Sequence, residues 1–264
     1  MSPKAPDVIA LTPHVTAIRV PFADIYTTVF LVKTESGNLL FDTATYDTDI
    51  TDIILPTLDG LGATGALSHV LLSHPHGDHA GGLGALLAAL PHLTVIAGSE
   101  ELGTQHPKAH LVPMTEGTLL DVLRVVAIPG HTADAIGLFD TRTKTLLSGD
   151  GLQLFGIYGS GVWGANIRYP KAHLAALDRL REMEIDAIYP AHDYHPLGSA
   201  YVGKDAIRQA LDACARPLYL IRDMIRENAD VSDEALAAAY NAMGDPPTVG
   251  AHVFAAVRRE LCAE

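Results

Sequence analysis

Six consecutive residues of this 264-residue chain carry three imidazoles and one carboxylate, in the run His74-Pro75-His76-Gly77-Asp78-His79. Imidazole nitrogens and carboxylate oxygens are the protein ligands that zinc and related divalent metals take. Side chains at positions i and i+2 of a helix point apart, so the spacing predicts a tight, non-helical loop. The run therefore predicts a metal site on a loop, directly after an apolar strand expected at residues 67–73.

Three further polar positions follow apolar runs and could complete the same site. They are His131 after residues 122–128, Asp150 after residues 145–147, and His192 after residues 187–190. Strand ends at one edge of an α/β sandwich converge on a common cleft, so we expect these side chains to meet the 74–79 loop. The five histidines and two aspartates of this set are enough for two metals that share a carboxylate and a water.

The elements expected around these positions alternate between strands and helices. Apolar spacing predicts helices at residues 49–61 and 171–183, and in an Ala/Leu segment after the 74–79 loop. β-Branched and apolar runs predict strands at residues 14–20, 25–32, 38–41, 67–73, 93–97, 121–128, 143–147 and 186–189. This alternation is typical of the α/β class.

After His195 the pattern becomes helical. We expect two regions, a main domain over residues 1–197 and a helical C-terminal region over residues 198–264 packed on it. Within the second region, Pro217 is expected to restart a helix rather than lie inside one. Ser232 is a predicted N-cap, because its hydroxyl can accept a hydrogen bond from a backbone amide of the following turn.

Composition limits the partners. The chain has 18 Lys plus Arg against 31 Asp plus Glu, a formal net charge of −13, and 48 % hydrophobic residues. The acid excess argues against nucleic acid or anionic lipid and leaves a small-molecule substrate as the expected partner. We expect a cytoplasmic protein, because no apolar run reaches the length of about 18 residues that a membrane span needs and the two cysteines form no disulfide framework. Oligomeric state stays open.

The segment 152–169 is a long connection rich in glycine and aromatic residues. Long loops without regular structure tend to be functional. We expect its aromatic side chains, together with two residues after His192, to line a substrate pocket, with pinning of the loop to its own domain as the alternative. The pocket candidates are Phe155, Tyr158, Trp163, Tyr194 and His195.

The combined pattern resembles the metallo-β-lactamase superfamily. The matching features are the His-x-His-x-Asp-His run with Gly81-Gly82 after it, the Gly-His-Thr at 130–132, Gly149-Asp150, His192, and Phe41-Asp42-Thr43. The resemblance covers residues 14–195 and implies a four-layer αββα sandwich with a dinuclear metal site at one sheet edge. It is closest to the dinuclear members that resemble glyoxalase II and the lactonases, because true β-lactamases of this fold generally lack this ligand set.

The resemblance also implies a role for each matched residue. His74, His76 and His131 would hold one metal, and Asp78, His79 and His192 would hold the other. Asp150 would bridge them, and Asp42 and Thr132 would orient the ligands through hydrogen bonds. Two zinc ions are the expected cofactors, although manganese, iron and cobalt accept the same donors.

The chemistry expected of such a site is hydrolysis. A water shared by two dications ionises near neutral pH, and the resulting hydroxide attacks an ester, thioester or lactone-type carbonyl. Asp78 could take up the proton of the nucleophile and pass it to the leaving group. Cleavage of a carbonyl bond and cleavage of a phosphodiester use the same ligands, so the ligand set does not select the bond that is hydrolysed.

Two alternatives to this hydrolase use the same residues differently. The segment 189–194 resembles the last motif of persulfide dioxygenases, which hold one iron with two histidines and an aspartate. A non-catalytic metal-binding protein is the other alternative. Within the hydrolases, the net charge disfavours phosphodiesterases that act on transfer RNA. Gln153 and Leu154 stand where acyl-homoserine lactonases carry a tyrosine, and no cationic glutathione-binding cluster is evident in the tail.

Overall fold

The computed structural model describes residues 7–100, 106, 109–159, 164–243 and 249–263. Its strands belong to two sheets accompanied by helices, which confirms the predicted α/β class. The chain divides into two compact units, one formed by Met1–Val126 with Ile136–Thr143 and the other by Ala127–Ala135 with Lys144–Glu264. The predicted boundary between residues 197 and 198 stays a prediction.

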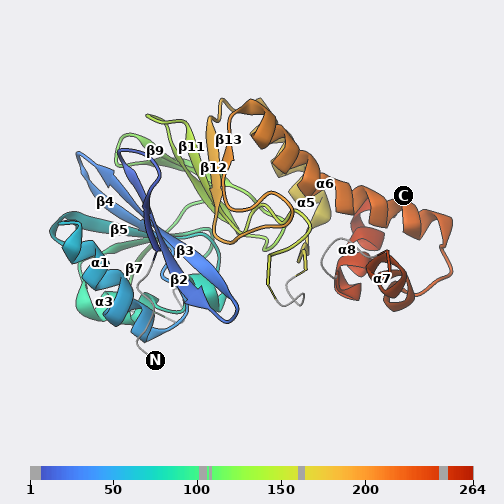
Figure 1. Cartoon of the computed structure of the whole chain (residues 1–264), viewed down its shortest axis with the longest axis horizontal. Coiled ribbons are helices and arrows are strands. Elements are labelled where there is room, and N and C mark those ends of the chain that lie inside the picture. The colour runs from blue at the N-terminus through green and yellow to red at the C-terminus, as the bar shows by residue number, and fades with distance from the viewer. Residues whose placement is uncertain (1–6, 101–105, 107–108, 160–163, 244–248, 264) are drawn as a thin grey trace. The chain divides into compact units, whose positions relative to one another are not determined.

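The first unit is built on a seven-stranded sheet in sequence order (Figure 1). The first four strands pair antiparallel, and the last four pair parallel, so that β4 belongs to both sets. The sheet contains β1 (Asp7–Ala10), β2 (Val15–Phe22), β3 (Ile25–Thr34), β4 (Gly37–Phe41), β5 (Leu67–Leu72), β6 (Thr94–Ala97) and β7 (His110–Pro113).

Helices pack on this sheet through one apolar core. Ile50, Leu58 and Leu86 are fully buried against strand residues such as Val70. Figure 1 shows α1 and α3 beside the blue and cyan strands of this sheet. The helical elements are η1 (Asp49–Ile54), α1 (Leu55–Gly60), η2 (Thr64–Ala66), α2 (Gly77–Ala80) and α3 (Leu83–Ala89).

The helix predicted at residues 49–61 is a π-helical turn followed by an α-helix. Pro56 lies at the start of α1 and has no backbone N–H to bond the carbonyl four residues earlier. The pitch therefore changes where the proline interrupts the α-helical hydrogen bonds.

The remaining strands belong to a second sheet of six strands. In it β8 and β9 form an antiparallel hairpin, and β10 is buried along its whole length. Strand β11 pairs parallel with β12, and β13 pairs antiparallel with β12. Their bounds are β8 (Gly117–Leu119), β9 (Leu123–Ala127), β10 (Ile136–Asp140), β11 (Thr145–Gly149), β12 (Ala187–Pro190) and β13 (Tyr201–Val202).

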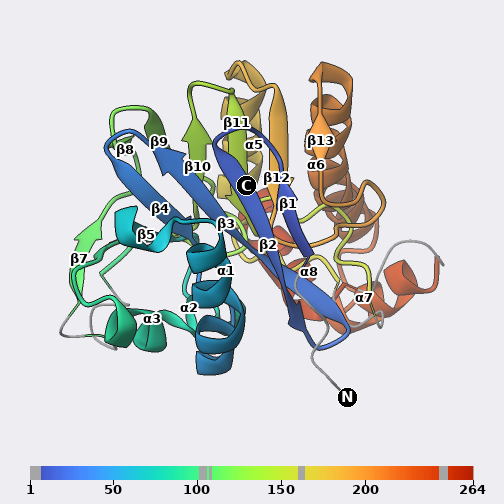
Figure 2. The same ribbon diagram turned by 60° about the vertical axis from the view of Figure 1, so that its left-hand side comes forward.

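Helices of the second unit form their own core. Helix α5 (Pro170–Glu182) lies in the connection between β11 and β12, as expected between neighbouring parallel strands. Helices α6 (Lys204–Glu227), α7 (Asp233–Asn241) and α8 (Ala251–Leu261) follow and contact one another (Figure 2). Leu218, Tyr240 and Phe254 are among the buried residues that join them. The predicted C-terminal helices are therefore present.

The expectation for Pro217 is wrong, whereas that for Ser232 is confirmed. Pro217 lies buried inside the continuous helix α6, because apolar residues from Ala210 to Ile225 stabilise one face on both sides of it. The Ser232 hydroxyl accepts a hydrogen bond from the Ala235 amide at 3.3 Å.

Within the described residues, none of the helices combines the length and the apolar character that a membrane crossing would need. Cys214 and Cys262 are both free thiols. Burial raises the pKa of the Cys214 thiol to about 12, so this side chain stays protonated and behaves as part of the core.

Candidate metal centre

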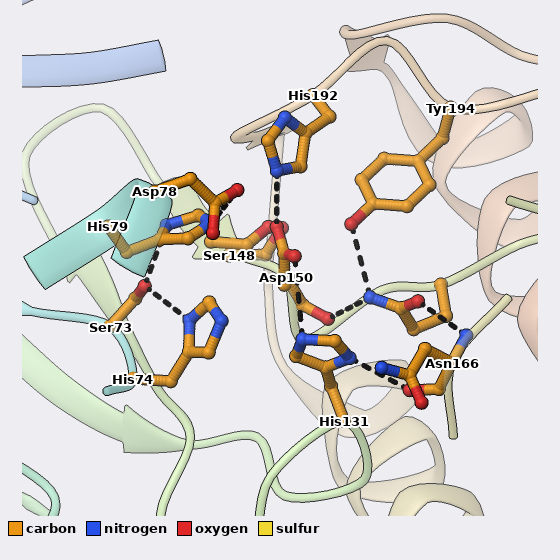
Figure 3. A network of polar contacts seen from close by, with 12 residues as sticks. Ser73, His74, Asp78, His79, His131, Ser148, Asp150, Asn166, His192 and Tyr194 are labelled. Atoms are coloured by element: carbon orange, nitrogen blue, oxygen red, sulfur yellow. Dashed lines mark hydrogen bonds and ion pairs between the residues drawn. The ribbon is translucent and has the colours of Figure 1, made fainter. Parts of the chain in front are cut away.

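The first unit presents four candidate ligands directly after β5. His74 follows the strand. Its ring centroid lies 4.6 Å from the ring centroid of His76 and 4.2 Å from the ring centroid of His79. The Nε2 atom of His79 lies 3.4 Å from a carboxylate oxygen of Asp78. The three imidazoles and the carboxylate predicted from the sequence therefore gather in one place, which we call the β5 cluster. Figure 3 shows His74, Asp78 and His79 of this cluster.

The expectation of a non-helical loop is correct for the first half of this run and wrong for the second. Gly77–Ala80 form the short helix α2, and His76 is its N-cap with an extended backbone. The amides of His79 and Ala80 bond to the His76 carbonyl. Only the adjacent residues Asp78 and His79 lie inside the helix, so the rule that separates positions i and i+2 does not apply between them.

Asp42 orients His79 from the end of β4. Its Oδ2 atom lies 2.7 Å from His79 Nδ1, and both side chains are fully buried. Asp42 also accepts hydrogen bonds from the Ser73 amide at 2.7 Å and the Ser73 hydroxyl at 2.8 Å. It adopts a left-handed backbone with φ of 66°, which aspartate tolerates better than most residues. The contact expected between Asp42 and a candidate ligand is therefore present.

Ser73 extends the same network to His74. Because the Ser73 hydroxyl donates to Asp42, its oxygen can accept from His74 Nδ1 at 3.0 Å. Figure 3 shows Ser73 between His74 and His79. The hydrogen bonds assign a proton to Nδ1 of both imidazoles and leave their Nε2 lone pairs for a metal. Sequence reasoning missed Ser73. The signal that could have indicated its role is its position directly before His74.

The second unit presents three candidate ligands around one carboxylate. Asp150 Oδ2 lies 3.6 Å from His131 Nε2, and Asp150 Oδ1 lies 3.3 Å from His192 Nε2 (Figure 3). Gly149 at the end of β11 pairs with Pro190 at the end of β12, so Asp150 and His192 emerge at the same edge. We call this group the Asp150 cluster. Its carboxylate faces a different imidazole with each oxygen.

A backbone carbonyl orients His131. The Nδ1 atom of His131 donates to the Asn166 carbonyl oxygen at 2.8 Å, which leaves the Nε2 lone pair for a metal. Backbone amides of Arg168 and Tyr169 in turn bond to the Gly130 carbonyl at 2.8 and 3.0 Å. Sequence reasoning missed Asn166, because a backbone carbonyl has no signature in residue type.

His173 supports the same loop from α5. It is fully buried, and burial together with the smaller effect of His131 lowers its pKa to about 4. Gly130 has φ of 153°, and a Cβ atom there would overlap His173 Nδ1. The neutral ring therefore packs directly on the backbone that carries His131.

The remaining predicted ligand-orienting residue, Thr132, is placed differently from Asp42. Its buried hydroxyl makes no hydrogen bond with the residues that the structure describes. Its carbonyl accepts the Gly130 amide at 3.0 Å and closes the turn that presents His131. An orienting role for the Thr132 hydroxyl stays a prediction.

The aromatic residues expected in a substrate pocket pack on their own unit. Tyr158 lies 5.1 Å from His195 between ring centroids, and Phe155 lies 6.1 Å from it. The Tyr158 hydroxyl donates to the Pro196 carbonyl at 3.3 Å. Tyr194 is fully buried, and its hydroxyl oxygen accepts from the Gln153 amide at 3.1 Å. These contacts favour pinning of the loop. Trp163 lies outside the described residues, so the pocket role stays a prediction.

Both clusters fit divalent metals. Their donors are imidazole nitrogens and carboxylate oxygens only, the set that zinc, manganese, iron and cobalt accept. Three of the imidazoles belong to His74, His79 and His131, whose Nδ1 atoms contact a hydroxyl, a carboxylate and a carbonyl respectively. Such partners fix the tautomer and orientation of a metal-binding histidine.

Comparison with known proteins identifies a family whose sequence model covers these clusters. Residues 23–192, more than half of the chain, match the sequence model described as Metallo-beta-lactamase superfamily. This range contains both clusters.

Curated relatives include fungal thioesterases. An atrochrysone carboxyl ACP thioesterase of Aspergillus terreus (strain NIH 2624 / FGSC A1156) is 31 % identical over 63 % of this chain and 53 % of its own length. The thioesterase dmxR1 of Cryptosporiopsis sp. (strain 8999) is also 31 % identical, over 63 % of this chain and 48 % of its own length. The lactamase-like protein notP of Aspergillus sp. (strain MF297-2) is 29 % identical over 72 % of this chain and 58 % of its own. The chain thus spans about half the length of these relatives.

Solved structures show the same fold. The DIM-1 metallo-beta-lactamase superposes with a TM-score of 0.64 at 16 % identity, over 81 % of this chain and 99 % of that one. A metallo-beta-lactamase from Hirschia baltica gives a TM-score of 0.62 at 16 % identity, over 80 % of this chain and 98 % of that one. From the family match, the shared fold and the two His/Asp clusters, we conclude that this chain is a member of the metallo-β-lactamase superfamily.

Proposed function

We propose that this protein is a dinuclear metal hydrolase that attacks a carbonyl carbon of a small molecule. We propose further that the bond it cleaves is a thioester. The observation that carries the proposal is the Asp150 carboxylate, whose two oxygens each face the Nε2 atom of a different histidine. A carboxylate in this position could contribute to the binding of two metals, and two metals held close together could activate one nucleophilic water.

The two clusters would supply a single centre. His74, His76 and His131 would hold one ion, and Asp78, His79 and His192 the other, with Asp150 shared. Zinc is the first candidate, and manganese, iron and cobalt fit the same donors. When bound, two such ions make a shared water acidic near neutral pH and polarise the substrate carbonyl.

The chain's own residues then have separate tasks. Asp42 and the Asn166 carbonyl hold imidazoles at fixed angles, so no reorganisation is needed when charge develops on the carbonyl oxygen. Asp78 is half-buried beside His79 and would accept the proton of the attacking water. A thiolate leaving group needs little help from an acid, because free thiols ionise at a pKa of about 8.5.

The choice of a thioester rests on the relatives. Two of them are named atrochrysone carboxyl ACP thioesterases, and both are 31 % identical to this chain. Esters and lactones present the same carbonyl and are the competing substrates.

A hydrolysis panel tests the proposal. Protein loaded with two equivalents of zinc is offered a thioester, an ester, a lactone and a phosphodiester of matched acyl size. We expect the thioester to give the highest kcat/KM and chelation to abolish turnover. Turnover of the phosphodiester alone, or of none of the four, would contradict the proposal.

Replacement of Asp78 tests its role. Asp78→Ala should lower kcat by roughly 10²–10⁴-fold, the usual contribution of a positioned acid or base. Asp47→Ala, at an exposed aspartate two residues before η1, is the matched control and should leave kcat unchanged. A fully active Asp78→Ala protein with two bound metals would refute the assignment.

Metal analysis separates the two other functions considered for this chain. One iron per chain with oxygen-dependent turnover of a persulfide would indicate a dioxygenase. Bound metal without hydrolysis of any member of the panel would indicate a non-catalytic metal-binding protein. Two zinc ions per chain together with thioester hydrolysis would support the proposal over both.

A further inference from the structure

A cationic pocket lies in the second unit, between the segment 166–169 and helix α8, although no cationic cluster is evident in the sequence of the tail. It is a cavity of about 400 Å³ lined by Asn166, Arg168, Tyr169, His252, Ala256 and Arg259. Three of these six side chains are basic, and among the residues that the structure describes the lining contains neither aspartate nor glutamate. In a chain of net charge −13, such a gathering of basic groups stands out from the average surface.

The charge of the pocket is only partly compensated. Among the described residues, the Arg168 guanidinium makes no hydrogen bond or ion pair. Arg259 donates to the Arg168 carbonyl at 3.2 Å and to Glu260, outside the lining, at 2.7 Å. The pKa of His252 is lowered by partial burial and then by the positive charge of Arg168. The Arg168 guanidinium is therefore the lining charge that no carboxylate of the described residues balances.

The pocket is connected to a candidate metal ligand through one residue. The Asn166 carbonyl accepts from His131 Nδ1 at 2.8 Å, while the Asn166 side-chain oxygen lies 2.9 Å from His252 Nε2. The Arg168 and Tyr169 amides bond to the Gly130 carbonyl beside the same histidine. A group held in the pocket would therefore lie against Asn166, the residue whose backbone carbonyl orients the candidate ligand His131.

We infer that this pocket, which we call the Arg168 pocket, binds an oxyanion at the non-reacting end of the substrate, either a carboxylate or a phosphate. This inference rests on the hydrolase function proposed above. Arginine is suited to the task because its planar guanidinium forms paired hydrogen bonds with both kinds of oxyanion. A volume of about 400 Å³ is large enough for such a group with a short stretch of the chain that carries it.

Binding is tested first, without reference to catalysis. The zinc-loaded protein is titrated with inorganic phosphate and, separately, with succinate, while the ring proton signals of His252 are followed by NMR. We expect a saturable shift with at least one anion and loss of that shift in Arg168→Gln. Arg226→Gln, at an exposed arginine near the end of α6, is the control and should keep it. An unchanged response in Arg168→Gln would overturn the inference, because anions at the metals alone would explain it.

Specificity is tested second, with acyl thioesters whose thiol ends in a phosphate, a carboxylate or a neutral hydroxyl group. We expect an anionic end to raise kcat/KM by about tenfold or more, the effect of one charge-assisted hydrogen bond. Arg168→Gln should abolish this preference, so that the anionic and neutral thioesters are hydrolysed by the variant at similar kcat/KM. The phosphate and carboxylate arms decide between the two sources of the oxyanion.

The two tests distinguish failure of the inference from failure of the hydrolase proposal. If none of the thioesters is hydrolysed but phosphate or succinate shifts His252 only when Arg168 is present, the pocket stands and the proposed reaction fails. If all three thioesters are hydrolysed at equal kcat/KM, the reaction stands and the substrate role of the pocket is overturned. Arg259→Gln is a second variant, which should weaken binding in the same direction.

Discussion

The orientation of single imidazole rings is the feature on which the candidate centre depends at the residue scale. A histidine binds a metal with a nitrogen that carries a lone pair, and the hydrogen bond of its other nitrogen decides which one that is. For His79 and His131 these partners are a buried carboxylate and a backbone carbonyl. Metal affinity should therefore be sensitive to residues that touch no metal.

Asp42→Asn tests this dependence. The amide nitrogen of the new side chain would face either Ser73 or His79, both of which donate to Asp42 in the native protein. We expect zinc affinity to fall about 10–100-fold, as is typical when the partner of a metal-binding histidine is lost. Competition with a chromogenic chelator measures the change. Asp52→Asn, at an exposed aspartate of η1, should have no effect, and equal zinc affinity in Asp42→Asn would contradict the orienting role.

His173 predicts an acid-sensitive contribution to stability. Its pKa falls from 6.5 to about 4 because the ring is completely buried. In the unfolded chain the ring binds a proton near its ordinary pKa, whereas the folded protein binds it only near pH 4. Lowering the pH from 7 through this window therefore favours unfolding, by about 2 kcal/mol at pH 5.

Urea unfolding at pH 7 and pH 5 measures this contribution. His173→Leu should lose less unfolding free energy than the native protein between the two pH values, because the leucine binds no proton in either state. His110→Gln, at an exposed histidine, is the control and should follow the native protein. An identical pH dependence in His173→Leu would contradict the buried, neutral assignment.

Close backbone contacts decide the structure at the element scale. Helix α3 begins after Gly82, whose amide bonds to the Ala44 carbonyl in the segment after β4 at 3.3 Å. A Cβ atom at Gly82 would overlap the Thr43 carbonyl oxygen and lie 2.7 Å from Ile50 Cγ1. Thr43 in turn donates to the His79 carbonyl through its amide and its hydroxyl, at 2.7 and 2.9 Å. The glycine thus permits the contact that holds the β5 cluster in place.

Gly82→Ala, at the N-cap of α3, and Gly84→Ala, in its first turn, form a matched pair. Gly82→Ala should lower the free energy of unfolding by about 3 kcal/mol, because the rigid backbone of Thr43 cannot move away from an added methyl group. At Gly84 the nearest atom to a new Cβ is His106 Cε1 at 3.7 Å, an ordinary contact. Gly84→Ala should therefore be neutral or stabilise by up to about 1 kcal/mol. Equal effects of the two variants in urea unfolding would contradict the close approach.

At the scale of the whole molecule, the proposed centre would need ligands from both compact units. The β5 cluster belongs to the first unit and the Asp150 cluster to the second. A ligand that binds only the folded state stabilises it by about 4 kcal/mol when its concentration is a thousand times Kd. If one centre holds both ions, this stabilisation extends to both units.

Thermal unfolding with and without zinc tests this coupling. We expect calorimetry of the zinc-loaded protein to show one transition, and chelation to lower its Tm by about 2–4 °C for each kcal/mol of binding free energy lost. Asp150→Ala should reduce the effect of zinc on the whole transition. Zinc that raises the melting temperature of only one unit would contradict a shared centre.

The sequence by itself determined the ligand types, the α/β class and the helical tail. Such features depend on residue type and on periods of two to four residues, so they can be predicted before folding is considered. The strand before His74 and the helix after Tyr169 appear where apolar periodicity predicts them.

Only the tertiary structure decided how the candidate ligands are oriented and where the basic pocket lies. The carbonyl of Asn166 and the hydroxyl of Ser73 act through position rather than through residue type. Arg168 and Arg259 are 91 residues apart and meet only when α8 packs beside the segment 166–169. Contacts between distant parts of a chain depend on packing geometry, which local periodicity does not encode.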